Sequence, residues 1–181
     1  MADVDELHAL AVEFLGACVE ALDTVPTLAP GLGGAPARSF VDFGPPVFDF
    51  ATQAEQAEDC DQLTVHVSTL FGGAQVPKAG GERINLVPFI ATIARCCAPT
   101  MDNQGRSFPS AVKQAFAAQI HADKWALWNY IFNKIAAGLL FDKCGQIQWG
   151  GIVPLNPSGA CAGSQLTINV SVDGYQTVLG T

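Results

Sequence analysis

Charged side chains are scarce in this 181-residue chain: Asp, Glu, Lys and Arg make up 14% of it, whereas hydrophobic residues make up 49%. Cations are the rarer kind, with 9 Lys and Arg against 17 Asp and Glu, so the net charge is −8 at pH 7. An acidic surface repels nucleic-acid phosphates rather than holding them. The composition therefore argues against a protein that binds DNA or RNA through a basic face. The alternative to any role of this charge toward nucleic acid is a solvated acidic face that keeps the protein soluble. The high apolar content indicates either a large core or apolar surface reserved for subunit contacts.

The sequence also lacks a hydrophobic run long enough to span a bilayer. We therefore expect no membrane association. The first six residues, MADVDE, are acidic, which is unlike the basic start of a signal peptide. On this basis we expect a protein made in a reducing cytosol.

Regular cysteine spacing is missing, although the chain has six cysteines. In a reducing compartment we expect free thiols. Cys96 and Cys97 are adjacent, so in a strand they point to opposite faces and cannot chelate one metal ion. A zinc site built from Cys60, Cys144, Cys161 and a histidine stays open, but no spacing in the chain asks for one.

Catalytic signatures are missing as well: the chain has no G-x-S-x-G, P-loop, C-x-x-C or H-E-x-x-H motif. His121 and Asp123 are two residues apart on an expected helix, so their side chains diverge. His66 lies on the polar face of an expected strand, which indicates an exposed or interface histidine rather than a ligand. We expect no cofactor, no metal and no catalytic residue, and predict that the protein is not an enzyme. A cytosolic enzyme with a cysteine nucleophile remains the alternative from another class.

The charge that is present is distributed unevenly along the chain. Residues 1–61 carry 12 acidic residues and 1 basic residue, whereas residues 62–181 carry 5 acidic and 8 basic residues. The two parts therefore have net charges of −11 and +3, which together give −8. One region is strongly acidic and the remainder is mildly basic.

The longest periodic segment runs from Ser107 to Phe141 and predicts one long helix. Its apolar residues recur every three or four positions, as on the buried face of a helix; they are Val112, Phe116, Ile120, Leu127, Trp128, Ile131, Ile135 and Leu139. Pro109 suits the first turn and Gly138 suits the end. The segment 122–124 interrupts the apolar stripe, which indicates a kink or a change of packing partner. A second, amphipathic helix is expected over residues 3–23.

Alternating apolar residues predict strands in the rest of the chain. Gln62–Leu70 and Gln165–Asp173 alternate most clearly, and Gln146–Val153 should pair antiparallel with the latter. Ile84–Cys96 contains Pro88, where we expect a bulge or a sheet edge because proline cannot donate a ladder hydrogen bond.

These elements predict a single α+β domain over residues 1–181. We expect a mostly antiparallel sheet of four to five strands, with the N-terminal helix and the long helix packed on one face. A short edge strand is expected within residues 38–50. Residues 71–83 form a Gly-rich connection that is too long for a tight hairpin, so we expect a loop or projecting arm there.

Three patches of the sequence carry a family resemblance. The first is Asp59–Val65 (DCDQLTV), an acidic turn that runs into a strand. The second is Ala94–Pro99 (ARCCAP), followed by Asp102–Gly105 (DNQG) and by Pro109-Ser110 at the start of the long helix. The third is Gly151–Gly163 (GIVPLNPSGACAG), which is followed by an alternating strand.

In this order, the patches resemble the small tail terminator, or neck, proteins of long-tailed phages that infect actinobacteria, over residues 1–175. The resemblance implies a structural virion protein without enzymatic activity. It implies a homo-hexameric ring that caps the tail tube protein and joins it to the head–tail connector or stopper protein, while DNA passes through without specific binding. Such a ring would be assembled in the host cytoplasm and located in the tail neck of the virion. Another neck or tail-tube component remains the alternative within this class.

Two sets of residues are candidates for this role. The candidate oligomer interface lies in the expected arm and at the proline of the strand Ile84–Cys96. Its residues are Phe71, Val76, Pro77, Lys78, Arg83 and Pro88. The candidate lining of the DNA passage is an acidic cluster at Glu55, Glu58, Asp59 and Asp61. A passage wall of the same sign as DNA lets the duplex move without sticking.

Overall fold

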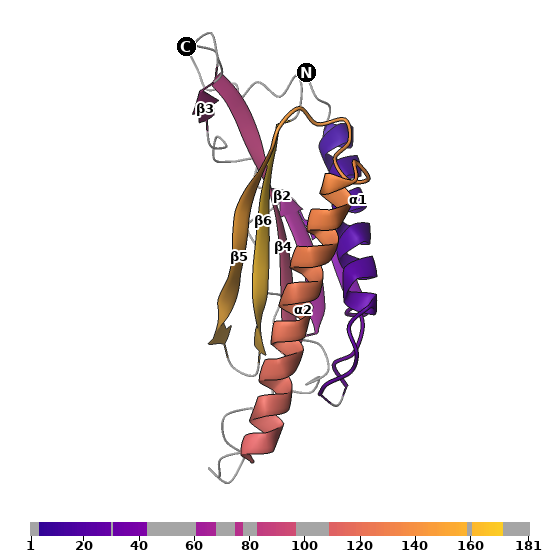
Figure 1. Cartoon of the computed structure of the whole chain (residues 1–181), viewed down its shortest axis with the longest axis vertical. Coiled ribbons are helices and arrows are strands. Elements are labelled where there is room, and N and C mark those ends of the chain that lie inside the picture. The colour runs from indigo at the N-terminus through magenta and orange to yellow at the C-terminus, as the bar shows by residue number, and fades with distance from the viewer. Residues whose placement is uncertain are drawn as a thin grey trace.

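The structure is a computed structural model, and it describes residues 4–29, 31–42, 61–67, 75–77, 83–96, 109–158 and 161–171. It is an α+β fold, as the sequence predicts (Figure 1). In chain order the elements are α1 (Val4–Asp23), β1 (Arg38–Asp42), β2 (Gln62–Val67), β3 (Gln75–Pro77), β4 (Arg83–Cys96), α2 (Ser110–Ala136), β5 (Ile147–Ser158) and β6 (Cys161–Ser171).

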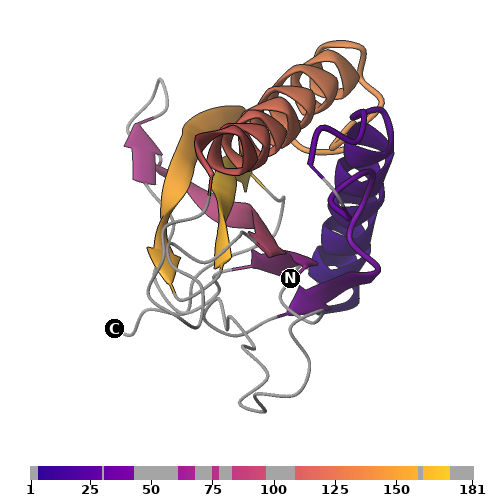
Figure 2. The ribbon, with the colours of Figure 1, turned by 90° about the horizontal axis from the view of Figure 1, so that it is seen from below.

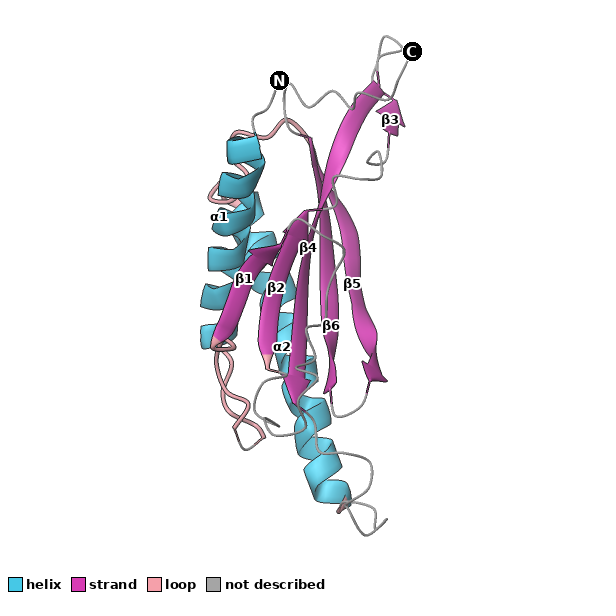
Figure 3. Ribbon diagram, turned by 180° about the vertical axis from the view of Figure 1, so that it is seen from behind, coloured by secondary structure: helices cyan, strands magenta, loops and turns pink. Residues whose placement is uncertain are grey.

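The strands form a mostly antiparallel sheet with the order β1-β2-β4-β6-β5, and β3 pairs with the beginning of β4 (Figure 3). Only β1 and β2 run parallel among these neighbours. β1 confirms the short edge strand expected within residues 38–50, and β5 forms the other edge. β4 lies in the centre of the sheet.

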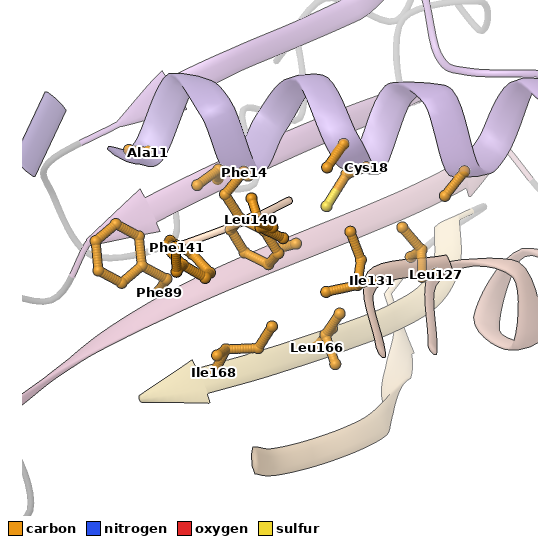
Figure 4. Close-up of a cluster of buried hydrophobic side chains, with 14 of the residues drawn as sticks. Ala11, Phe14, Cys18, Phe89, Leu127, Ile131, Leu140, Phe141, Leu166 and Ile168 are labelled. Carbon is orange, nitrogen blue, oxygen red and sulfur yellow. The ribbon is translucent and has the colours of Figure 1, made fainter. Parts of the chain in front are cut away.

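Both helices cover the same face of the sheet, as expected (Figures 1 and 2). α1 packs on β1 and β2, α2 packs on β6, and the two helices contact each other. The register of the strands produces the apolar sheet face on which the helices pack, because Val65, Ala91 and Leu166 are cross-strand neighbours on β2, β4 and β6. Figure 4 shows these layers meeting: Phe14 and Cys18 of α1 point toward Ile131 of α2 and the side chains of the sheet.

The buried stripe of α1 agrees with the sequence pattern. Leu7, Ala11, Phe14, Cys18 and Leu22 follow one another at helical spacing and are all buried. Burying a Leu or Phe side chain contributes about 1.5–3 kcal/mol. This stripe is therefore enough to hold α1 on the sheet.

The end of α2 is built around two backbone positions in the left-handed region. Gly138 has φ +66° and follows the C-cap residue Ala137, at the position where the sequence predicts the helix to end. Phe141 has φ 58°, where a bulky residue is strained by about 1–3 kcal/mol. Its ring is buried and lies 5.7 Å from the Phe14 ring and 5.2 Å from the Phe89 ring. Burial and ring packing contribute about as much as the strain costs, so the turn is held by the core.

The long helix is shorter than the sequence pattern predicts. It spans Ser110–Ala136, about 40 Å at 1.5 Å per residue, rather than the whole of Ser107–Phe141. Leu139 was expected on the buried face, but the helix has ended before it and its side chain is exposed. The interruption at 122–124 does not break the helix; Asp123 is buried within it.

The strands also differ from expectation at three points. β4 runs through Pro88 without a bulge, because its register with β6 is unbroken from Leu86 to Cys96. The bulges lie in β5 instead, between Trp149 and Gly151 and between Leu155 and Ser158. β5 and β6 pair antiparallel as expected, but they extend to Ser158 and from Cys161, into the stretch expected to be a turn-rich link.

Candidate functional site

The expected arm is a hairpin between β3 and the start of β4. Val76 lies opposite Ile84, and Pro77 lies opposite Arg83. Five residues separate β3 from β4, so this is not the tight two-residue hairpin that the sequence pattern excludes. The hairpin diverges from the rest of the sheet at one end of the molecule, so it projects as an arm does (Figures 1 and 3).

The structure brings together three of the six candidate interface residues. Val76 and Pro77 belong to β3, and Arg83 begins β4. Pro88 lies further along β4, opposite Asn169 of β6, and so belongs to the body of the sheet. Phe71 and Lys78 lie outside the described residues. The assignment of these six residues to an interface stays a prediction.

Within the described residues, the hairpin has only two strands. β2 pairs with β4 from Phe89 onward, and β6 pairs with it from Leu86 onward, so residues 83–85 pair with β3 alone. A two-stranded hairpin is at best marginally stable in water without a third strand or a helix against it. The hairpin is therefore a segment that gains from a partner.

Of the acidic cluster, the structure describes only Asp61, because Glu55, Glu58 and Asp59 lie outside the described residues. Asp61 precedes β2, and its side chain is 22% exposed. Both of its carboxylate oxygens accept hydrogen bonds from Nη1 of Arg95, at 3.0 and 3.1 Å. Burial raises the pKa of Asp61, and the charge and hydrogen bonds of Arg95 offset this only in part. The lining role of the four acids stays a prediction, but Asp61 already has an internal partner.

Arg95 is the centre of a buried ionic network that sequence reasoning missed. Its side chain is fully buried, near the end of β4. Nε and Nη2 donate to the two carboxylate oxygens of Asp123, at 2.8 and 3.2 Å, and Nη2 also donates to the carbonyl of Gly34 at 2.7 Å. Burial by itself would lower the pKa of Arg95, but Asp123 and Asp61 outweigh it and raise the pKa. Arg95 is therefore charged at every relevant pH.

A buried glutamine extends this network to the loop after α1. Gln119 Nε2 donates to Asp123 at 3.1 Å. Its Oε1 accepts from the backbone N–H groups of Leu28 and Ala29, at 2.7 and 3.4 Å. The network thus joins the end of β4, the start of β2, the first half of α2 and the loop after α1. It is an internal clamp, since Arg95 and Asp123 are wholly enclosed and Asp61 largely so.

The sequence held a signal for this clamp. Arg95 continues the alternation of Ala91 and Ile93 on the core face, and Asp123 lies four residues before Leu127 on the buried side of α2. One cation and one anion at apolar positions indicate a buried pair. The expected divergence of His121 and Asp123 is confirmed: His121 instead accepts a hydrogen bond from Trp125 on the outer side of the helix.

The opposite face of β2 carries buried polar side chains. Gln62, Thr64 and His66 alternate with the core residues, and each retains a side-chain nitrogen or oxygen without a hydrogen-bond partner. His66 was expected to be exposed or at an interface, but only 2% of it is exposed. Burial lowers the pKa of His66, and the charge of Asp42 on β1 partly opposes this. A neutral imidazole is therefore favoured at this position.

The cysteine-nucleophile alternative gains nothing from the cysteines whose side chains are described. Cys18 is fully buried, and burial raises its pKa, so it is held as a thiol and cannot attack a substrate. Cys144 is half-buried at the end of the turn that follows α2. Among the described residues no cluster of three or more His, Cys, Asp or Glu could hold a metal ion.

Neither helix of the described chain has both the length and the apolar content needed to cross a bilayer. No protein-family model and no curated protein matches this chain.

Proposed function

We propose that this protein is a tail terminator of a long-tailed phage. In this proposal it is a structural protein whose copies form a hexameric ring at the neck of the virion. The observation that carries the proposal is the projecting hairpin of β3 and β4, which lies in the segment where the Gly-rich sequence predicts an arm (Figure 3). A closed ring needs a different patch on each side of every subunit, and an arm leaving the body supplies one of them.

The remaining structure is consistent with such a part. α1 and α2 form a helical layer on one face of the sheet, and the Arg95 clamp joins that layer to the ends of β2 and β4. A body held in this way gives every subunit the same shape, and identical contacts repeated by rotation close a ring.

The position of such a ring in the neck determines its partners. The tail tube protein meets one side of the ring, the head–tail connector or stopper protein meets the other, and DNA passes through without specific binding. The acidic sequence supports this last point, since the chain has a net charge of −8 and DNA phosphates are repelled by a wall of the same sign.

Removal of the arm tests the proposal. A variant that lacks residues 73–81 loses β3 and the turn, while the rest of β4 keeps its partners in β2 and β6. The wild type should form a ring of one defined mass that persists on dilution in mass photometry. The deletion variant should give a folded monomer with a cooperative thermal transition.

A second variant separates strand loss from shortening, since residues 73–81 can be replaced by a Gly/Ser segment of the same length. It should also be monomeric, because a Gly/Ser chain does not form the β3 strand. A ring that survives both changes would show that the hairpin is not the joint. A wild type that is monomeric at every concentration would contradict the proposed function as a whole.

A further inference from the structure

Three aromatic side chains are in ring contact between α2 and β5, and a fourth, Trp125, lies nearby on α2. The rings of Trp128 and Phe132 lie 4.9 and 5.6 Å from the ring of Trp149. Trp125 lies two turns before Phe132 on the outer side of α2, and each of these two side chains is 48% exposed. We call Trp125, Trp128, Phe132 and Trp149 the aromatic surface.

Such a surface is costly to leave in water. Single exposed apolar residues are normal, but a half-exposed Phe132 packed on Trp149, with a half-exposed Trp125 on the same helix, is typical of an interaction site. Tryptophan in particular is enriched among the residues that dominate binding energy at protein interfaces. The bond from Trp125 Nε1 to His121 Nε2, 2.8 Å long, satisfies the polar atom of the ring without using the partner. The apolar part of the ring is thus left for docking.

The position of the aromatic surface restricts what can cover it. It lies at the β5 edge of the sheet, whereas α1 and β1 lie at the other edge. α1 carries an apolar strip of its own: Val12 is 48% exposed, and Leu15 and Val19 follow it at helical spacing and are half-buried. This strip and the aromatic surface are at opposite edges, so they cannot meet within one copy. They can meet between two copies placed edge to edge.

The charges at the two edges are complementary. Glu20 pairs with Lys134 of the same copy, and Asp123 is buried against Arg95, so these three charges are left out. Residues 4–42, which include α1 and β1, then contain 5 acidic residues and 1 basic residue, a net charge of −4. Residues 110–158, which include α2 and β5, then contain 3 lysines and 1 acidic residue, a net charge of +2. Opposite charge steers two surfaces together and selects the orientation in which they dock. An edge-to-edge contact between unlike edges is therefore favoured over a contact between like edges.

We propose that the aromatic surface docks on the α1 strip of a second copy of this chain, with Trp125 and Phe132 as its central contacts. The contact is heterologous, because the two surfaces differ, and repetition by rotation closes it into a ring. The inference rests on the proposed function and adds a second contact beside the hairpin at each junction.

Charge introduced at either surface tests the docking. We suggest Trp125→Glu with Phe132→Glu on one surface and Val12→Glu on the other. All three side chains are about half exposed, so the fold should survive, which the thermal transition will show. The matched control is Val153→Glu, since Val153 is 52% exposed and lies on the sheet face away from the helices.

Mass photometry should find the wild type and Val153→Glu as rings and both surface variants as monomers. Loss of hot-spot residues weakens a junction by about thirtyfold or more. An equal mixture of the two surface variants has one intact pair of surfaces per pair of chains. It should therefore give a dimer and no ring, although each variant alone is monomeric. A contact between two like surfaces would instead give a dimer of one variant on its own.

The outcomes separate this inference from the function on which it rests. A ring that persists in the Trp125/Phe132 variant overturns the docking surface but leaves the ring proposal standing. A ring that persists in Val12→Glu overturns α1 as the covering surface, and loss of the ring in Val153→Glu overturns the specificity of the effect. A monomeric wild type overturns both the ring and this contact.

Discussion

At the scale of the residue, Arg95 shows how the fold accommodates a fully buried cation. A guanidinium group presents its donors in a planar fork that suits carboxylates, and here it meets Asp123 with two hydrogen bonds and Asp61 with two more. Burial of a charge is tolerated only when its partners are in place. Removing one partner of this buried ion pair should therefore lower the free energy of unfolding far more than removing one partner of an exposed ion pair.

Asp123→Asn should destabilise the protein by about 3–5 kcal/mol, because it leaves Arg95 buried without its main countercharge. Urea unfolding followed by circular dichroism measures this as a lower free energy of unfolding. Asp142→Asn is the control: Asp142 is exposed, and surface changes usually stay within about 0.5 kcal/mol. Equal effects of the two substitutions would show that the buried pair contributes nothing.

At the scale of the element, α1 and α2 are joined on their outer side by a second set of polar contacts. Glu20 of α1 accepts a hydrogen bond from the Tyr130 hydroxyl at 2.8 Å. It also forms an ion pair with Lys134, whose Nζ lies 2.9 Å from the Glu20 carboxylate. Both contacts to α2 lower the pKa of Glu20, with that from Lys134 the larger. The hydrogen bonds with Glu20 are in turn the largest cause that raises the pKa of Tyr130 and the pKa of Lys134.

This contact stabilises the protein only between two pH limits. Because the pKa of Glu20 is lowered in the folded state, its contribution is present above its unfolded value of 4.5 and is lost as the pH falls through the folded pKa. Because the pKa values of Tyr130 and Lys134 are raised, their contributions are lost as the pH rises through about 10 and beyond.

Glu20→Gln should therefore lower the Tm at pH 7 and have no effect at pH 2–3. Thermal scans across this range measure the difference from the wild type. Glu13→Gln, one heptad earlier on the exposed side of α1, should leave the Tm unchanged at both pH values. A Tm difference for Glu20→Gln that is the same at pH 3 and pH 7 would exclude an electrostatic origin.

Elements with a strict period were predictable from the sequence, and contacts between elements were not. Leu63, Val65 and Val67 alternate, so β2 and its buried face could be read directly. Of the two alternatives expected at Pro88, the bulge is absent, whereas a local sheet edge agrees with the described residues, in which β2 pairs with β4 only from Phe89 onward.

The candidate site was predictable to a similar degree. The hairpin could be expected as an arm because the glycines of residues 71–83 interrupt the strand pattern. The Arg95 clamp could not be expected as such, because Asp61, Arg95 and Asp123 are far apart in sequence and meet only through tertiary packing. Trp125 and Phe132 escaped notice because they lie off the apolar stripe of α2.

At the scale of the whole molecule, the charge of the acidic cluster is expected to act on DNA in transit. The structure separates Asp61 from this set, since lysine there would face Arg95. Glu55, Glu58 and Asp59 can be replaced by lysine together without touching that pair. The ring formed by this triple lysine variant should bind duplex DNA at low salt and release it at high salt. The wild-type ring should not bind DNA at either salt concentration.

Gel shift or filter binding at two salt concentrations measures this difference. The lysine variant must first be shown to form a ring of wild-type mass. A ring that assembles normally and holds no DNA at low salt would place these three acids on a solvated outer face rather than in the passage.

The long central strand has a mechanical consequence. β4 is a single strand of 14 residues, about 45 Å at 3.3 Å per residue, with the hairpin at one end and the Arg95 clamp near the other. A pull on the hairpin therefore runs along the strand and loads its hydrogen bonds with β2 and β6 in shear, all at once, instead of peeling them apart one by one. In the proposed ring, tension between neighbouring subunits would then be carried along β4 through the body of each subunit.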